Sequence, residues 1–83
     1  PSNRQALYQL ADIAYRGGRY EQTRSHLIRL HQQSEPSAAS VWLGLRTERR
    51  LGNPAAEASY AAQLGSRFGS AEEYKMMMQG KYE

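Results

Sequence analysis

The sequence predicts an all-α fold of two antiparallel helical hairpins and a short C-terminal helix, within one domain of 83 residues. Apolar residues recur at steps of three and four, which is the period of an amphipathic helix. Gly and Pro interrupt this pattern, and the interruptions are only a few residues long, so consecutive helices must run antiparallel. No segment shows the alternation of apolar and polar residues that marks a half-buried strand.

The first predicted hairpin covers residues 4–35. Its first helix runs over Arg4–Arg16 and ends at Gly17-Gly18, because glycine adopts the left-handed conformation that closes a helix without a Cβ clash. The apolar stripe expected on this helix contains Leu7, Leu10 and Ala14. A second helix starts near Tyr20, and its apolar pattern fades before Pro36, which lacks a backbone donor.

The second predicted hairpin covers residues 37–69. Ser37 is a candidate N-cap for a third helix, which ends at Gly52. Asn53-Pro54 then starts a fourth helix, since Asn is a favourable N-cap and Pro is tolerated at the first helical position.

A capping helix is predicted over about residues 71–79. Ser70 and Glu73 have the spacing of a capping box, in which each side chain satisfies an amide of the other residue. We expect the methionine run that follows, Met76 to Met78, to seal the last apolar face of the domain. The alternative is an adaptable interface, because thioethers repack at little cost.

The chain repeats itself with a period of 34 residues. The equivalent pairs are Leu7 and Val41, Ala11 and Leu45, Gly18 and Gly52, and Leu30 and Leu64. This period is the length of one tetratricopeptide repeat, a helical hairpin that buries its apolar face by stacking on neighbours. We therefore expect a tetratricopeptide-repeat α-solenoid fragment, in which the first helix of the second unit is one residue longer. The alternative is an unrelated helical bundle with hairpins of similar length.

The second unit and the residues after it also resemble a known family. The matching segments are Trp42-Leu43-Gly44-Leu45-Arg46, Arg50-Leu51-Gly52-Asn53, Ala56-Glu57-Ala58-Ser59-Tyr60-Ala61-Ala62-Gln63-Leu64, Arg67-Phe68, Ser70 and Glu73-Tyr74. They resemble the C-terminal end of the tetratricopeptide-repeat lipoproteins of type IV pilus biogenesis and stability, the PilW/PilF family of secretin pilotins. Gly69 departs from the pattern, because a Pro is expected after the Arg-Phe pair.

The resemblance implies a function and a location. It implies a scaffold on the periplasmic side of the outer membrane that assists secretin assembly and pilus stability. The implied partner is a secretin subunit or another pilus assembly protein, and the implied membrane attachment is only through a lipidated N-terminal Cys that is absent from this sequence. The alternative is a generic periplasmic repeat adaptor, for example of the cytochrome c maturation type, that binds a peptide or protein.

Composition and spacing argue against several other functions. The sequence contains no cysteine, which excludes disulfides and thiolate metal ligands, and no apolar run approaches the roughly 20 residues of a membrane-spanning helix. His26 and His31 are five residues apart and point in different directions on a helix, and no catalytic motif accompanies them. We therefore predict no enzyme activity, no catalytic residue, no cofactor and no metal site.

The charge of the chain favours an acidic protein partner. The formal net charge is +3, and arginine is densest at Arg46, Arg49 and Arg50. We do not expect nucleic acid as a partner, because no aromatic-basic motif of an RNA-binding module is present. A helical nucleic-acid binder would instead show an affinity that falls steeply with salt.

The candidate protein-binding residues lie on the first helix of each unit. They are Tyr8, Asp12, Tyr15, Arg16, Glu48 and Arg49. The four residues of the first helix recur at steps of three and four, and in this repeat class such helices line the concave groove. The alternative is that the tyrosines only pack against a preceding repeat. Because about three repeats are usually needed for stability, we also expect self-association through the first helix.

Overall fold

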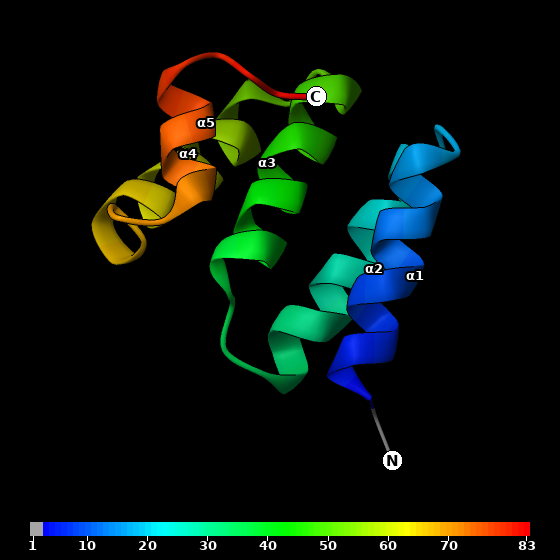
Figure 1. The fold of residues 1–83 in the computed structure, drawn as a ribbon. Coiled ribbons are helices and arrows are strands. Elements are labelled where there is room, and N and C mark those ends of the chain that lie inside the picture. The colour runs from blue at the N-terminus through cyan, green and yellow to red at the C-terminus, as the bar shows by residue number, and fades with distance from the viewer. Residues whose placement is uncertain (1–2) are drawn as a thin grey trace.

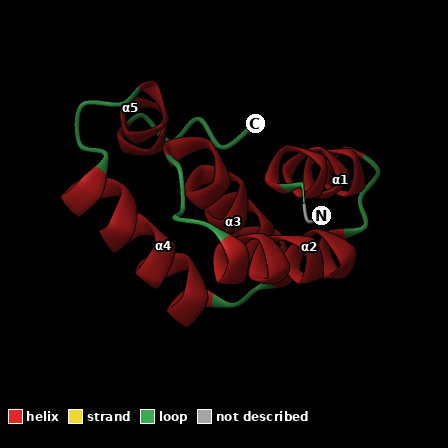
Figure 2. Cartoon of the chain, turned by 90° about the horizontal axis from the view of Figure 1, so that it is seen from below, coloured by secondary structure: helices red, strands yellow, loops and turns green. Residues whose placement is uncertain are grey.

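The computed structural model describes residues 3–83 and contains five α-helices in that range (Figure 1). Their bounds are α1 Arg4–Arg16, α2 Tyr20–Gln33, α3 Ala38–Leu51, α4 Pro54–Arg67 and α5 Glu72–Met78. The helices pack as sequential pairs, α1 on α2 and α3 on α4, and residues 3–83 form no strand. Figure 2 shows α1, α3 and α5 in one row and α2 and α4 in the other. The all-α prediction is confirmed.

The predicted signals for helix ends act as expected in the two hairpins. Gly18 and Gly52 both adopt left-handed backbone conformations, with φ of 77° and 72°. The Ser37 hydroxyl accepts a hydrogen bond from the Ser40 amide, and the Ser40 hydroxyl accepts one from the Ser37 amide. The Asn53 side chain accepts a hydrogen bond from the amide of Ala56 and so caps α4.

The predicted capping box at α5 is wrong. The helix begins at Glu72 with Ala71 at the N-cap position, and no side chain caps it. The Ala71 amide donates to the carbonyl of Phe68, which closes a turn after α4. This turn places Ser70 one residue before the N-cap, so its hydroxyl is not positioned to bond the first turn of α5.

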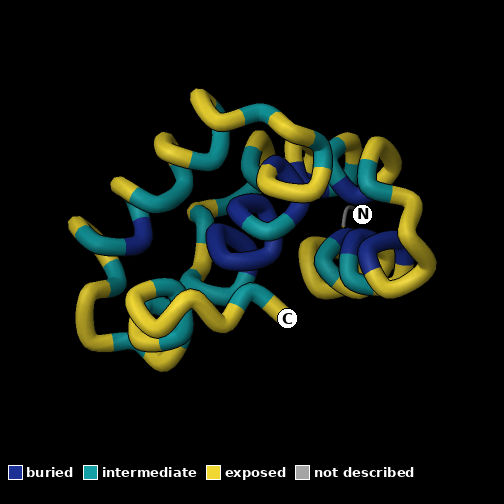
Figure 3. The backbone as a smooth tube through the Cα atoms, turned by 90° about the horizontal axis from the view of Figure 1, so that it is seen from above, coloured by how far each residue is buried: buried dark blue, intermediate teal, exposed yellow. Residues whose placement is uncertain are grey.

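The core is organised around α3, whose buried residues form the dark blue centre of Figure 3. Eight of its residues are buried, namely Ser40, Val41, Trp42, Leu43, Gly44, Leu45, Thr47 and Glu48. Leu43 packs with the buried residues of α1 and α2, whereas Val41, Trp42 and Leu45 pack with Leu64 of α4. The helix therefore joins two apolar clusters into one core.

Residues separated by 34 positions have equivalent environments. Leu7 and Val41, Ala11 and Leu45, and Leu30 and Leu64 are all buried, and the pair Gly18 and Gly52 has the same backbone conformation. The expected length difference is also present, because α1 has 13 residues and α3 has 14.

The apolar stripe predicted for α1 needs a correction. Leu10 is 48% exposed and Ile13 is 58% exposed, while Ala11 and Tyr15 are buried beside Leu7 and Ala14. The buried face of α1 is thus rotated away from Leu10. The physical reason is that α1 packs almost entirely against α2, and no described helix covers its other apolar side.

Candidate functional site

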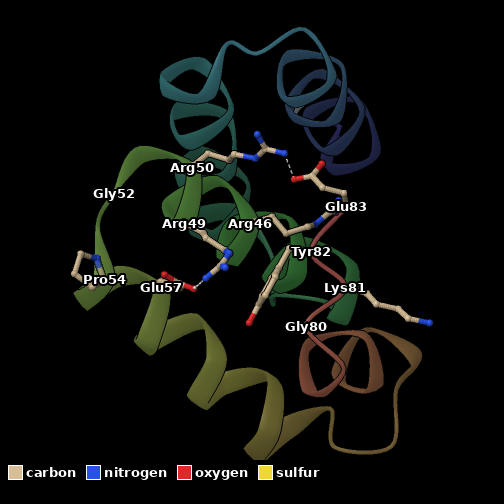
Figure 4. A pocket seen from close by; sticks show the side chains of 10 residues that line it. All are labelled: Arg46, Arg49, Arg50, Gly52, Pro54, Glu57, Gly80, Lys81, Tyr82 and Glu83. Atoms are coloured by element: carbon tan, nitrogen blue, oxygen red, sulfur yellow. Dashed lines mark hydrogen bonds and ion pairs between the residues drawn. The ribbon is translucent and has the colours of Figure 1, made fainter.

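Four of the predicted contact residues line one open cleft between α1 and α3. Tyr8, Asp12, Tyr15 and Arg16 come from α1 and face Arg46 and Arg50 of α3 across a cleft of about 750 Å³. An adjoining cleft of about 870 Å³ contains Arg49 and shares Arg46 and Arg50 with the first (Figure 4). We call the two clefts together the arginine groove.

Glu48 lies outside the arginine groove and lines a different cleft, together with Arg24 and Tyr60. Its side chain is buried and accepts two hydrogen bonds from Arg24 of α2, at 2.9 Å from Nε and 2.6 Å from Nη2. The reason is helical geometry, because a residue two positions after Arg46 lies about 200° around the helix from it. Glu48 therefore connects α3 to α2.

Tyr15 lines the groove but is almost entirely buried. The ring is 7% exposed and meets the ring of Tyr20 edge to face, with the centroids 5.3 Å apart. The tyrosine thus packs within its own hairpin. Its hydroxyl donates to the Glu83 carboxylate at 3.1 Å. Burial raises the pKa of this hydroxyl, so it remains a proton donor at neutral pH.

Tyr8 and Asp12 lie further along the same face of α1. Burial, followed by the nearby Asp12 carboxylate, raises the pKa of the Tyr8 hydroxyl. Asp12 forms an ion pair with Arg16 at 2.9 Å, one turn along the helix. This exposed pair contributes little to stability, but it leaves that end of the groove nearly neutral.

Arg46 and Arg50 are groove residues that the choice of candidates missed. The Arg46 guanidinium lies 5.0 Å from the ring centroid of Tyr15 and 5.3 Å from that of Trp42, and Arg50 lies 5.8 Å from that of Tyr20. Cation–π contacts of this kind hold a guanidinium in place while its N–H groups remain available. The 34-residue period could have found both arginines, because it relates them to Asp12 and Arg16.

The C-terminal residues Tyr82 and Glu83 also lie in the groove and were not predicted (Figure 4). Glu83 accepts hydrogen bonds from Arg50 and from Tyr15, which is 68 positions away in the sequence. The bond from Arg50 is the main reason that the pKa of the Glu83 carboxyl is lowered. No local sequence signal could have revealed a contact at this separation.

The groove offers guanidinium, phenol and aromatic surfaces, which suit carboxylates and aromatic rings. Among residues 3–83, no cluster of three or more His, Asp or Glu side chains could hold a metal ion. The described part of the chain also contains no helix that is long and apolar enough to cross a bilayer. Comparison with protein-family models, curated proteins and solved structures found no match.

Proposed function

We propose that this chain is a non-enzymatic protein-binding module of the tetratricopeptide-repeat type, which holds a segment of a partner protein in the arginine groove. One observation carries this proposal: the groove already holds a non-helical segment of the chain, Lys81 to Glu83, whose last residue accepts hydrogen bonds from Tyr15 of α1 and Arg50 of α3. A surface that binds one such segment has the shape and chemistry to bind another.

The repeat assignment is supported by both sequence and structure. The helices pack as sequential pairs, and residues 34 positions apart have equivalent burial or backbone conformation. The close approach of α3 and α4 at Gly44 adds to this, because a Cβ there would lie 2.5 Å from the Tyr60 ring. Small residues at such crossings are typical of stacked helical hairpins.

The biological setting that we propose is type IV pilus assembly. The support is the resemblance of Trp42 to Tyr74 to the pilus biogenesis lipoproteins. In this proposal the partner is a secretin subunit or another pilus assembly protein on the periplasmic side of the outer membrane. The alternative is a generic periplasmic repeat adaptor for a peptide or protein ligand, which would use the same groove.

A capture experiment tests the pilus proposal. The full chain is immobilised and incubated with purified type IV pilus secretin subunits, and we expect retention that Arg46→Glu/Arg50→Glu abolishes. Arg29→Glu and Arg4→Glu together are the matched control, because both arginines are exposed and neither contacts Glu83. Retention that survives the groove variant would reject the groove as the binding site.

The alternative is tested in parallel with a library of extended peptides. Peptides that protect the amides around Tyr8 and Tyr15 from hydrogen exchange, in the absence of any secretin binding, would favour the generic adaptor.

We also propose self-association through α1. Its exposed Leu10 and Ile13 have no covering element among residues 3–83, and a hairpin repeat normally buries this face against a neighbour. In sedimentation experiments across a concentration series, Leu10→Glu/Ile13→Glu should remain monomeric while the unchanged chain associates. A monomer at all concentrations would contradict this proposal.

A further inference from the structure

The chain reverses direction after α5 and returns toward α3. Gly80 has a φ of 72°, a left-handed value that an L side chain rarely adopts. The Lys81 amide donates to the carbonyl of Met76 at 2.8 Å, and the Gly80 amide donates to that of Met77 at 3.0 Å. These bonds close the C-terminus of α5 and direct Lys81 to Glu83 across α3, as the red end of the ribbon in Figure 1 shows.

Tyr82 occupies an aromatic subsite of the groove. Its ring stacks on the indole of Trp42, with centroids 5.8 Å apart and ring planes 24° apart. The guanidinium of Arg49 lies 3.9 Å from the Tyr82 centroid. The ring is therefore in contact with both an aromatic surface and a cation, which is a favourable setting for a phenol or phenyl group.

Glu83 occupies an adjacent anionic subsite. Its carboxylate accepts hydrogen bonds from the Arg50 guanidinium and the Tyr15 hydroxyl, so donors from α3 and α1 converge on it. Arg46 is held above the Tyr15 ring in the same cleft. A carboxylate placed here meets charge-assisted donors, which bind it more strongly than neutral donors do.

The charge of the groove matches this occupant. Arg49 is paired with Glu57 at 3.2 Å, and Arg16 is paired with Asp12. Arg50 pairs with Glu83, and within residues 3–83 Arg46 forms no ion pair. Without Glu83, two guanidinium groups would therefore face the centre of the groove with no carboxylate between them.

We propose that the arginine groove is a binding site for an extended segment of a partner protein in which an aromatic residue is directly followed by an acidic residue, and that Tyr82-Glu83 occupies this site in cis. The proposal rests on the protein-binding function above and specifies the ligand. Because a tethered segment has an effective concentration on the order of millimolar, the tail weakens binding of the partner segment by competition. The partner binds when it displaces the tail.

A peptide titration tests this. The probe is an acetylated, amidated peptide with the sequence of residues 79–83, Gln-Gly-Lys-Tyr-Glu. The protein is the full chain carrying Tyr82→Ala and Glu83→Ala, which removes both side chains from the subsites. Binding is followed by the fluorescence of Trp42, the only tryptophan in the chain, which lies under the aromatic subsite.

We expect the tail variant to bind the peptide at least tenfold more tightly than the unchanged chain. Replacing Tyr or Glu in the peptide should each weaken binding about tenfold, and adding Arg50→Gln to the protein should abolish it. Arg29→Gln is the matched control and should change nothing. Equal binding by the tail variant and the unchanged chain, or binding that ignores the Tyr and Glu of the peptide, would overturn the proposal.

Four further outcomes are distinguishable. If circular dichroism shows that the double variant is unfolded, Glu83→Ala alone takes its place, because this side chain is 58% exposed and only the anionic subsite is then emptied. A dimer of the unchanged chain that the tail variant abolishes would place the tail in a second copy and overturn occupation in cis. Peptide binding without capture of secretin subunits would reject only the pilus assignment, and the reverse result would reject only the ligand proposed here.

Discussion

The first helices of the two hairpins begin 34 residues apart and lie in very different surroundings. α3 packs against α2, α4 and α5 and is buried over most of its circumference, whereas α1 packs mainly against α2 and leaves Leu10 and Ile13 exposed. The difference arises from the number of neighbours and not from the helices themselves, since both begin at a capped N-terminus and end at glycine. We therefore expect buried apolar contacts, and with them stability, to be concentrated at α3, where the two hairpins meet.

The largest expected effect is the difference in lost stability between the same substitution on α3 and on α1. Leu43→Ala removes a fully buried side chain of α3 and should lower the free energy of unfolding by about 2–5 kcal/mol. Leu10→Ala, the same substitution on α1, should lower it by less than about 1 kcal/mol because the side chain is half exposed. Urea denaturation followed by far-ultraviolet circular dichroism measures both. Equal losses would contradict the comparison.

The next effect concerns the close crossing of α3 and α4. Gly44→Ala should destabilise the protein by about 1–3 kcal/mol, because the new Cβ would overlap the Tyr60 ring. Alanine is the better helix former, so propensity alone predicts the opposite sign. Thermal unfolding of Gly44→Ala in a Tyr60→Leu background is the control: with the ring removed, most of the penalty should disappear. A penalty unchanged by Tyr60→Leu would rule out this clash as its cause.

A smaller loss of stability is expected when the ion pairs of Arg24 are broken. The guanidinium of Arg24 pairs with the buried Glu48 and with the exposed Glu21. Glu48→Gln should cost about 1–3 kcal/mol, because Glu48 is buried and accepts two hydrogen bonds from Arg24. Glu21→Gln should cost less than about 0.5 kcal/mol, since Glu21 is exposed and its contact with Arg24 is 3.4 Å long. Chemical denaturation should rank the two variants in this order, and the reverse order would be incompatible with a buried Glu48.

The smallest expected effect is a pH dependence of stability that arises at the contact between α2 and α3. His31 of α2 lies 3.0 Å from the Ser40 hydroxyl and near the Tyr60 ring, and burial lowers its pKa below the ordinary value. The unfolded chain therefore binds this proton more readily than the folded chain. The stabilising contribution is complete above the unfolded pKa, near 6.5, and is lost as the pH falls toward the lowered pKa of the folded state.

Melting temperatures measured between pH 7.5 and 5 should therefore decline, and His31→Gln should make the decline shallower. The same slope in both proteins would assign the pH dependence to other groups.

The sequence by itself determined the number of helices, the glycine and cap signals that bound the first four, and their pairing into hairpins. These features depend on local chemistry: the glycines at 18 and 52 close helices, and Ser37 and Asn53 cap them. The period of 34 also located equivalent positions, because it follows from the length of each hairpin.

Only the tertiary structure decided which side of each helix is buried and what occupies the groove. Leu10 is exposed and Glu48 is buried because the neighbours of a helix, and not its own pattern, determine which positions are covered. The Tyr15–Glu83 contact joins residues 68 positions apart, and no local signal encodes it. The sequence showed the arginines of the groove as a cluster of positive charge. Only the structure showed that the chain turns back at Gly80 and places Tyr82 and Glu83 in the same groove.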